Sequence, residues 1–116
     1  MTKKQKENLK KLFNLEIPAG CEFNMQTFYD AEDDSKGGTK DSYKCGTCAC
    51  FAGYLPLVTG IDKKKLEWWD EYIERVTGIQ MYSNDFHYLF GTGWDNDLKR
   101  AKERLNNFIN NGYEAP

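Results

Sequence analysis

The stretch that decides the fold is KCGTCACFAG, Lys44–Gly53, which contains three of the four cysteines of the chain. Gly46 predicts a tight turn, and Thr47 is a residue type that accepts hydrogen bonds from the amides of a first helical turn. The residues that follow are mostly small and apolar, and free cysteine packs like a small hydrophobe. The stretch therefore predicts a turn leading into a buried helix over CACFAGYLPLVTG, which Pro56 kinks or ends. The residues of this structural motif are Cys45, Gly46, Thr47, Cys50 and Gly53.

A zinc site is the first alternative for the cysteines. Structural zinc takes four ligands, usually as two close pairs, and here only Cys45 and Cys48 form such a pair. On a helix that begins at Cys48, Cys48 and Cys50 differ by about 200° around the axis, so they could not share a metal. No metal or other cofactor is therefore expected, and the four-cysteine set remains the alternative: Cys21, Cys45, Cys48 and Cys50.

A reactive thiol is the second alternative. Cys48 would lie in the first turn of the expected helix, where exposed amides lower the pKa of a thiol. His87 is the only histidine and the only candidate base, and no third group that would orient it is identified. We therefore do not expect an enzyme.

Helical signals dominate the rest of the chain. Thr2 and Gln5 fit a capping box for a helix over residues 3–14, and Asp62 is expected to cap an amphipathic helix that ends at Gly78. A short helix is expected from residue 83 or 84 to Gly91, and a last one over residues 96–111. The segment 21–29 has a mixed period, which leaves it open between an extended chain and a helical turn. The sequence predicts a single all-α domain over residues 1–116, with five or six helices and an acidic loop near residues 30–42.

Composition limits the partners. The chain has 116 residues and a net charge of −2, which argues against a general nucleic-acid binder because such proteins carry a basic excess. No segment has the length of a membrane span, and the first residues lack the apolar run of a secretory signal. We therefore expect a cytoplasmic protein, without membrane contact, whose cysteines stay reduced.

Tryptophan and tyrosine supply the candidate binding residues. Trp68 and Trp69 are neighbours in one expected helix, so they cannot both point inward, and at least one is expected at the surface. Exposed tryptophans often dominate the binding energy of protein interfaces. The candidate surface anchors are Trp68, Trp69, Tyr72 and Trp94.

Four short motifs follow one another along the chain: F-x-M-x-x-F, CGT-x-A-C-x-x-G-Y, F-x-x-LFG-x-x-W and A-x-x-RL-x-x-F-I-x-x-G. Their order resembles a group of small accessory proteins encoded by tailed bacteriophages and prophages, over about residues 23–112. The most specific element is the core C-G-T-x-x-C-x-x-G, in which the matching cysteines are Cys45 and Cys50. Cys48 stands where an aliphatic residue is usual, and His87 matches no motif position. The resemblance implies a phage origin, in which case the compartment is the cytosol of the bacterial host, and it implies no particular activity.

These observations lead to one expected function and two alternatives. We expect an accessory protein that binds a host or viral macromolecule, for example as an inhibitor or modulator of a host system. A structural or virion-associated protein is the first alternative. A zinc-stabilised module or a thiol enzyme is the second.

Overall fold

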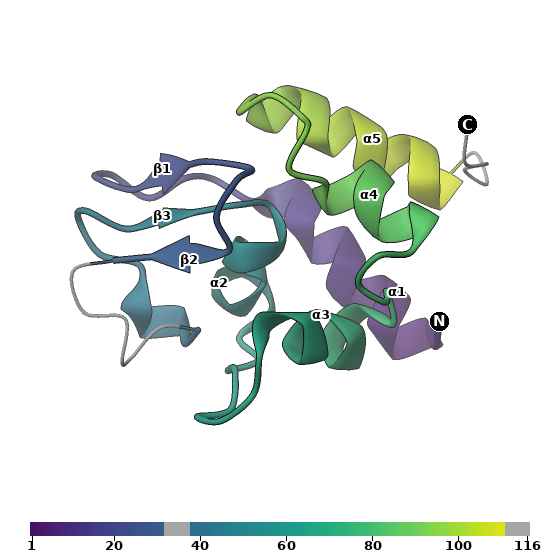
Figure 1. Ribbon diagram of the computed structural model, residues 1–116, viewed down its shortest axis with the longest axis horizontal. Helices are drawn as coiled ribbons and strands as arrows, with labels where there is room; N and C mark the ends of the chain where they lie inside the picture. Colours follow the sequence, from purple (N-terminus) through teal and green to yellow (C-terminus); the bar gives the residue numbers. More distant parts are fainter. Residues whose placement is uncertain (32–37, 111–116) are drawn as a thin grey trace.

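Five helices and a three-stranded mixed sheet form the part of the chain that the computed structural model describes, residues 1–31 and 38–110. In Figure 1 the sheet lies on the left with α2 beside it, while α1, α3, α4 and α5 lie toward the right, where α1 passes between α3 and α5. The helices are α1 Lys3–Lys10, α2 Leu55–Thr59, α3 Trp69–Thr77, α4 Asn84–Phe90 and α5 Leu98–Asn110; the strands are β1 Glu22–Phe23, β2 Tyr29–Asp30 and β3 Cys48–Ala49.

The sheet overturns the predicted all-α class, because the chain combines helices with strands. The strand β3 lies in the centre, parallel to β1 and antiparallel to β2. Each strand has only two residues, so none could show the alternation by which a strand is recognised in a sequence. The segment 21–29, which the sequence left open, contributes β1 and the start of β2.

The turn before β3 forms as predicted, but a strand follows it, and the predicted buried helix begins only with a 3-10 turn, Ala52–Tyr54, that leads into α2. Gly46 has φ +91°, and the Thr47 amide donates to the Lys44 carbonyl at 2.9 Å, which closes a tight turn. The buried Thr47 side chain accepts from the Lys44 amide at 3.2 Å, while the Thr47 carbonyl accepts from Glu22 at 2.8 Å. The amide and hydroxyl of Thr47 therefore stabilise the turn, and its carbonyl makes the first hydrogen bond to β1. The prediction that Thr47 caps a helix starting at Cys48 is wrong.

Gly53 brings the segment after β3 against the segment before β2. A Cβ atom at Gly53 would lie 1.6 Å from the carbonyl oxygen of Phe28, so no other residue fits without moving the backbone. Gly53 is thus required by a close approach, in which the partner is a backbone carbonyl. Pro56 lies in the first turn of α2, where its missing amide costs nothing, so it neither kinks nor ends a helix as predicted.

Tyrosine hydroxyls tie the core to the backbone. Tyr54, fully buried, donates to the Glu22 carbonyl at 2.6 Å, and Tyr43 donates to the Gly53 carbonyl. Tyr72, also fully buried, donates to the Ile61 carbonyl, and burial raises its pKa to about 12. Each hydroxyl satisfies its own donor and a carbonyl in a region with little access to water, where an unpaired polar group is costly.

Several predicted helix ends are confirmed. Thr2 and Gln5 form the capping box of α1, Gly78 ends α3 with φ +78°, and Ser83 caps α4, which ends at Gly91. The predicted continuation of the first helix to residue 14 takes the form of a 3-10 turn, Lys11–Asn14. Helix α5 begins at Leu98, where the Asp97 carboxylate accepts from the amide of Lys99 at 3.0 Å, and its predicted end at residue 111 falls outside the described residues.

The start of α3 differs from the prediction. Asp62 caps no helix, and α3 begins only at Trp69, with the Glu71 carboxylate accepting from the Trp68 amide at 2.9 Å. The intervening loop is held by Glu67, which binds the Arg75 guanidinium through two contacts of 2.7 and 2.8 Å. Leu66, which lies in this loop, is 90% exposed. Of the predicted acidic loop, residues 32–37 lie outside the described residues, and the rest includes Asp30 in β2 and a 3-10 turn, Lys40–Ser42.

Replacing Tyr54 by phenylalanine tests the hydroxyl ties. We expect Tyr54→Phe to lower the free energy of unfolding by about 1–2 kcal/mol, because the Glu22 carbonyl loses a buried donor. Tyr82→Phe is the matched control, since Tyr82 is 81% exposed, and it should change stability by less than about 0.5 kcal/mol. Urea denaturation followed by circular dichroism measures both variants. Equal stabilities for the two would contradict the assignment.

Candidate functional site

The four candidate surface anchors have different environments. Trp68 and Trp94 are 74% and 40% exposed, so the prediction that at least one of the adjacent tryptophans reaches the surface is correct. Trp69 is partly buried, with its ring stacked on Phe28 and Tyr29. Tyr72 is fully buried and contributes nothing to the surface, which removes it from the anchor set. Only Trp68 and Trp94 remain exposed enough to anchor a partner.

Cys48 lies between two carboxylates and not at a helix N-terminus. In the register of the sheet it is opposite Glu22 of β1 and Asp30 of β2. Burial raises the pKa of the Cys48 thiol, and the negative charges of Glu22 and Asp30 raise it further. The alternative of an activated Cys48 thiol finds no support here, because its surroundings disfavour the thiolate. His87, its proposed base, is exposed on α4, well away from the sheet (Figure 1).

The four-cysteine zinc alternative finds no support in the geometry. All four cysteines are free thiols, and within residues 1–31 and 38–110 no three metal-binding side chains gather at one point. Cys50 is buried, accepts from the Gly53 amide at 3.3 Å, and has a pKa raised to about 11 by burial. Cys21 instead donates to the Lys44 carbonyl at 3.3 Å. Each of these thiols has a local structural role.

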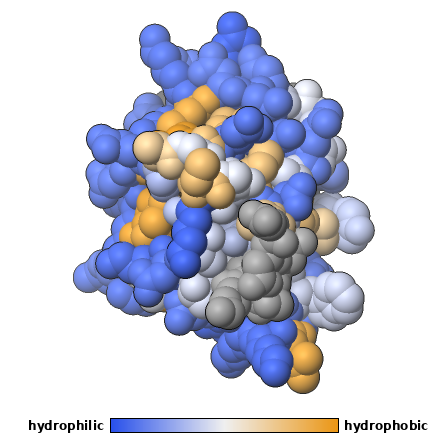
Figure 2. Space-filling view, turned by 90° about the vertical axis from the view of Figure 1, so that its left-hand side faces the viewer, coloured by the Kyte–Doolittle hydropathy of each residue, from blue (hydrophilic) through white to orange (hydrophobic). Residues whose placement is uncertain are grey.

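Apolar side chains are scattered over the sheet end of the molecule. Figure 2 shows this face, where the apolar residues of the described part form small patches separated by hydrophilic ones.

Of the part of the chain described, no helix has the length and apolar character needed to cross a membrane.

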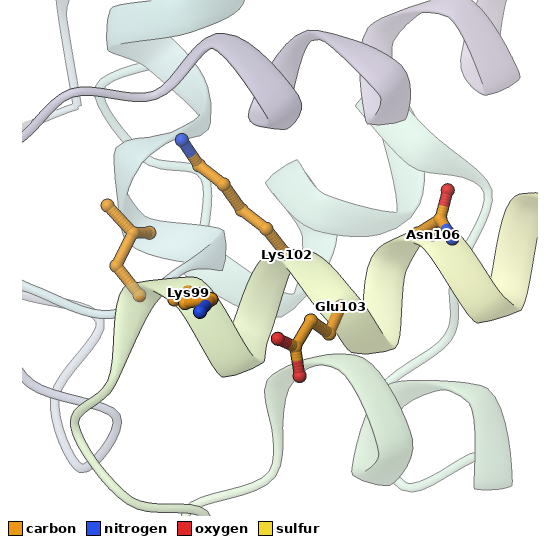
Figure 3. A pocket seen from close by; sticks show the side chains of 5 residues that line it. Lys99, Lys102, Glu103 and Asn106 are labelled. Carbon is orange, nitrogen blue, oxygen red and sulfur yellow. The ribbon is translucent and has the colours of Figure 1, made fainter.

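The largest concave region that we describe is a groove along α5. It has a volume of about 530 Å³ and is lined by Leu98, Lys99, Lys102, Glu103 and Asn106. Lys102 points away from the helix axis (Figure 3), and its Nζ donates to the Leu15 carbonyl at 2.7 Å. Its ammonium is thus occupied by the protein itself, and among the residues that the structure describes no aromatic side chain lines the groove.

Two smaller recesses meet at Trp94. One, the Trp94 recess, has a volume of about 350 Å³ and is lined by Tyr88, Trp94, Arg100, Glu103 and Arg104. The other, the Gly91 recess, has about 340 Å³ and is lined by His87, Gly91, Thr92, Gly93 and Trp94. Trp94 lines both recesses, so the two concave surfaces share this residue.

Trp94 is held in place by its neighbours although much of it is exposed. Its indole Nε1 donates to the His87 carbonyl near the end of α4 at 2.9 Å. Its ring meets the Tyr88 ring edge to face, with centroids 6.3 Å apart. On α5, the guanidinium of Arg104 lies 4.2 Å from the Trp94 ring centroid, a cation–π contact. The ring is therefore preorganised at the surface, which lowers the entropy cost of using it as an anchor.

The two arginines of the Trp94 recess differ in their pairing and in their burial. Arg100 binds the Asp95 carboxylate at 2.9 Å and approaches Asp97 at 3.7 Å. Arg104, one helical turn later, is only 9% exposed, and its Nε and Nη2 atoms find no acceptor among residues 1–31 and 38–110. Burial lowers the pKa of Arg104, which Asp95 partly offsets. A buried guanidinium with two unpaired donors is costly for a fold and calls for an explanation.

Arg104 is the functional candidate that the sequence reasoning did not identify. It is the arginine of the motif A-x-x-RL-x-x-F-I-x-x-G. The available signal was its position, since it lies three residues after Ala101 and next to Leu105, both buried. Helical spacing therefore places a charge at the border of the buried face, where a partner is normally required.

Comparison with known proteins adds no assignment. No family model matches the chain, and no match was found among curated proteins or solved structures.

The reactivity of Cys48 can be measured directly. We expect Cys48 to be alkylated more slowly at neutral pH than an unstructured thiol, because a raised pKa leaves less thiolate. Glu22→Gln should speed this reaction roughly two- to fivefold, since it removes a like charge directly across the strand pair. Mass spectrometry of digested protein over a pH series reports the rate at Cys48.

Glu16→Gln is the control for that series, because it removes an equal charge from an exposed residue outside the sheet. It should leave the rate at Cys48 unchanged. Alkylation of Cys48 faster than that of a model peptide would restore the case for a reactive thiol.

Proposed function

We propose that the protein acts by binding another protein through the surface around Trp94. This is the mode of action expected of a phage-encoded accessory protein whose partner, host or viral, is met in the cytosol of the bacterial host. The observation that supports the proposal best is the fixed, part-exposed Trp94 ring, which lines two recesses. Anchors of this kind, an aromatic ring or arginine beside a pocket, carry most of the binding energy at protein interfaces.

Trp94 is a better candidate than Trp68. Trp68 is more exposed, but it lines none of the three concave regions described above. It directly precedes α3, two residues after the exposed Leu66. An anchor that is held by a hydrogen bond and a cation–π contact loses less freedom on binding than one that projects into solvent.

Affinity capture from phage-infected bacteria tests the proposal. The wild-type protein should recover the same partner in repeated experiments, and Trp94→Ala should lose it, with a drop in affinity of roughly thirtyfold for a hot-spot tryptophan. Tyr82→Ala is the matched control, since it removes an exposed ring that lines neither recess, and it should retain the partner.

Thermal denaturation of both variants accompanies the capture experiment, so that loss of binding is compared between folded proteins. Equal recovery with Trp94→Ala and the wild type would refute the proposed surface. Recovery lost with Trp68→Ala and kept with Trp94→Ala would assign the binding to the other tryptophan.

A further inference from the structure

The unpaired atoms of Arg104 belong to a single binding edge. Nε and Nη2 are the two donors along one side of the guanidinium plane, the side with which arginine grips a planar anion in a bidentate manner. Both are buried, and both lack an acceptor among the residues that the structure describes. This pair of donors is therefore free to bind a ligand.

Two carboxylates lie near Arg104 but do not pair with it. Asp95 and Asp97 lie close enough to influence the Arg104 charge, yet both bind Arg100 instead, which is exposed and would be solvated without them. Their pairing with Arg100 removes the competing cation and leaves Arg104 as the recess's unpaired guanidinium. An intramolecular ion pair thus keeps the buried arginine available.

We propose that the Trp94 recess binds the side-chain carboxylate of an aspartate or glutamate from a protein partner, gripped side-on by Arg104. The proposal rests on the protein-binding function and names the chemistry that its partner presents. The Trp94 ring packs on the guanidinium, with its centroid 4.2 Å from Cζ, whereas Nε–H and Nη2–H point outward in the guanidinium plane. A carboxylate can therefore form a charge-assisted bidentate pair with this edge while the cation–π contact is kept.

The surroundings favour a carboxylate over a phosphate. Asp95 and Asp97 face Arg104, and Glu103 lines the recess, so a doubly charged phosphate meets three negative groups where a carboxylate brings one charge. A recess of about 350 Å³ has room for an acidic side chain. The adjoining Gly91 recess leaves space for a chain that continues past the bound residue, which a terminal carboxylate would not need.

Small carboxylates test the site without the partner. N-acetylglutamate N-methylamide, titrated into the wild-type protein, should give saturable NMR shifts of the Arg104 Nε–H and Trp94 Nε1–H resonances. The isosteric glutamine amide should give none. Inorganic phosphate and N-acetylalanine, a terminal carboxylate, should bind more weakly than the glutamate probe. Absence of saturation by the glutamate probe, or tighter binding of phosphate or N-acetylalanine, would overturn the proposal.

Arg104→Met separates this role from a structural one. The methionine keeps an unbranched apolar side chain beneath Trp94, and removing a buried unpaired charge should leave the melting temperature unchanged or higher. Binding of the glutamate probe, followed at Trp94, should fall at least about tenfold, which corresponds to 1.4 kcal/mol. Lys99→Gln removes an equal charge from the exposed face of the same helix and should change binding less than about twofold. A strongly lowered melting temperature in Arg104→Met would make Arg104 structural and contradict the proposal.

The failures of the two proposals are distinguishable. If the wild-type protein binds the glutamate probe but captures no partner, the proposed function fails and the site remains. If a partner is captured through Trp94 and its binding is insensitive to Arg104→Met, the carboxylate assignment fails and the protein-binding function remains.

Discussion

At Gly53 the backbone passes so close to the carbonyl of Phe28 that no side chain fits between them. This contact holds the segment after the central strand against the segment that leads into β2, and the Tyr43 hydroxyl adds a hydrogen bond to the Gly53 carbonyl. Because β3 pairs with both other strands, it forms the centre of the sheet. The end of β1 then reaches the helical half, where the Met25 amide donates to the side chain of Asn96 at 2.8 Å. The loop that follows Trp94 is thereby tied to the sheet, so the recess depends on the same framework.

The parts of the fold that follow local rules could be predicted from the sequence. The capping box of Thr2 and Gln5 and the left-handed end at Gly78 each depend on residues within one or two turns, and both were recognised. The strands could not be recognised, because two residues carry no periodicity and the pairing of Cys48 with Glu22 and Asp30 joins distant segments. Thr47 shows the ambiguity most clearly, since the hydroxyl that would cap a helix instead accepts from the turn that precedes it.

The candidate site was only half visible in the sequence. Trp94 could be nominated from its residue type, but its fixation depends on the His87 carbonyl and on Arg104, which lies on another helix. Tyr72 has the residue type of a surface anchor, but it lies on the inner face of α3 with Ile73 and Val76, and this position buries it. Whether an arginine of α5 is paired depends on three-dimensional packing. Asp95 and Asp97 pair with Arg100, which leaves two donors of Arg104 without an acceptor among the described residues. Helical spacing places Arg104 at the border of the buried face, but nothing in the sequence shows that two of its donors lack an acceptor.

The central claim is that the residues after Gly46 form the middle strand of a sheet and do not start a helix. Native-state hydrogen exchange, followed by NMR, tests it at the amides of Glu22 and Asn24, which donate to the carbonyls of Thr47 and Ala49 at 2.8 and 3.0 Å. If β3 pairs with β1, both amides exchange far more slowly than the same amides in an unstructured peptide. Exchange of both at the unstructured rate, in a protein whose α5 amides remain protected, would contradict the account.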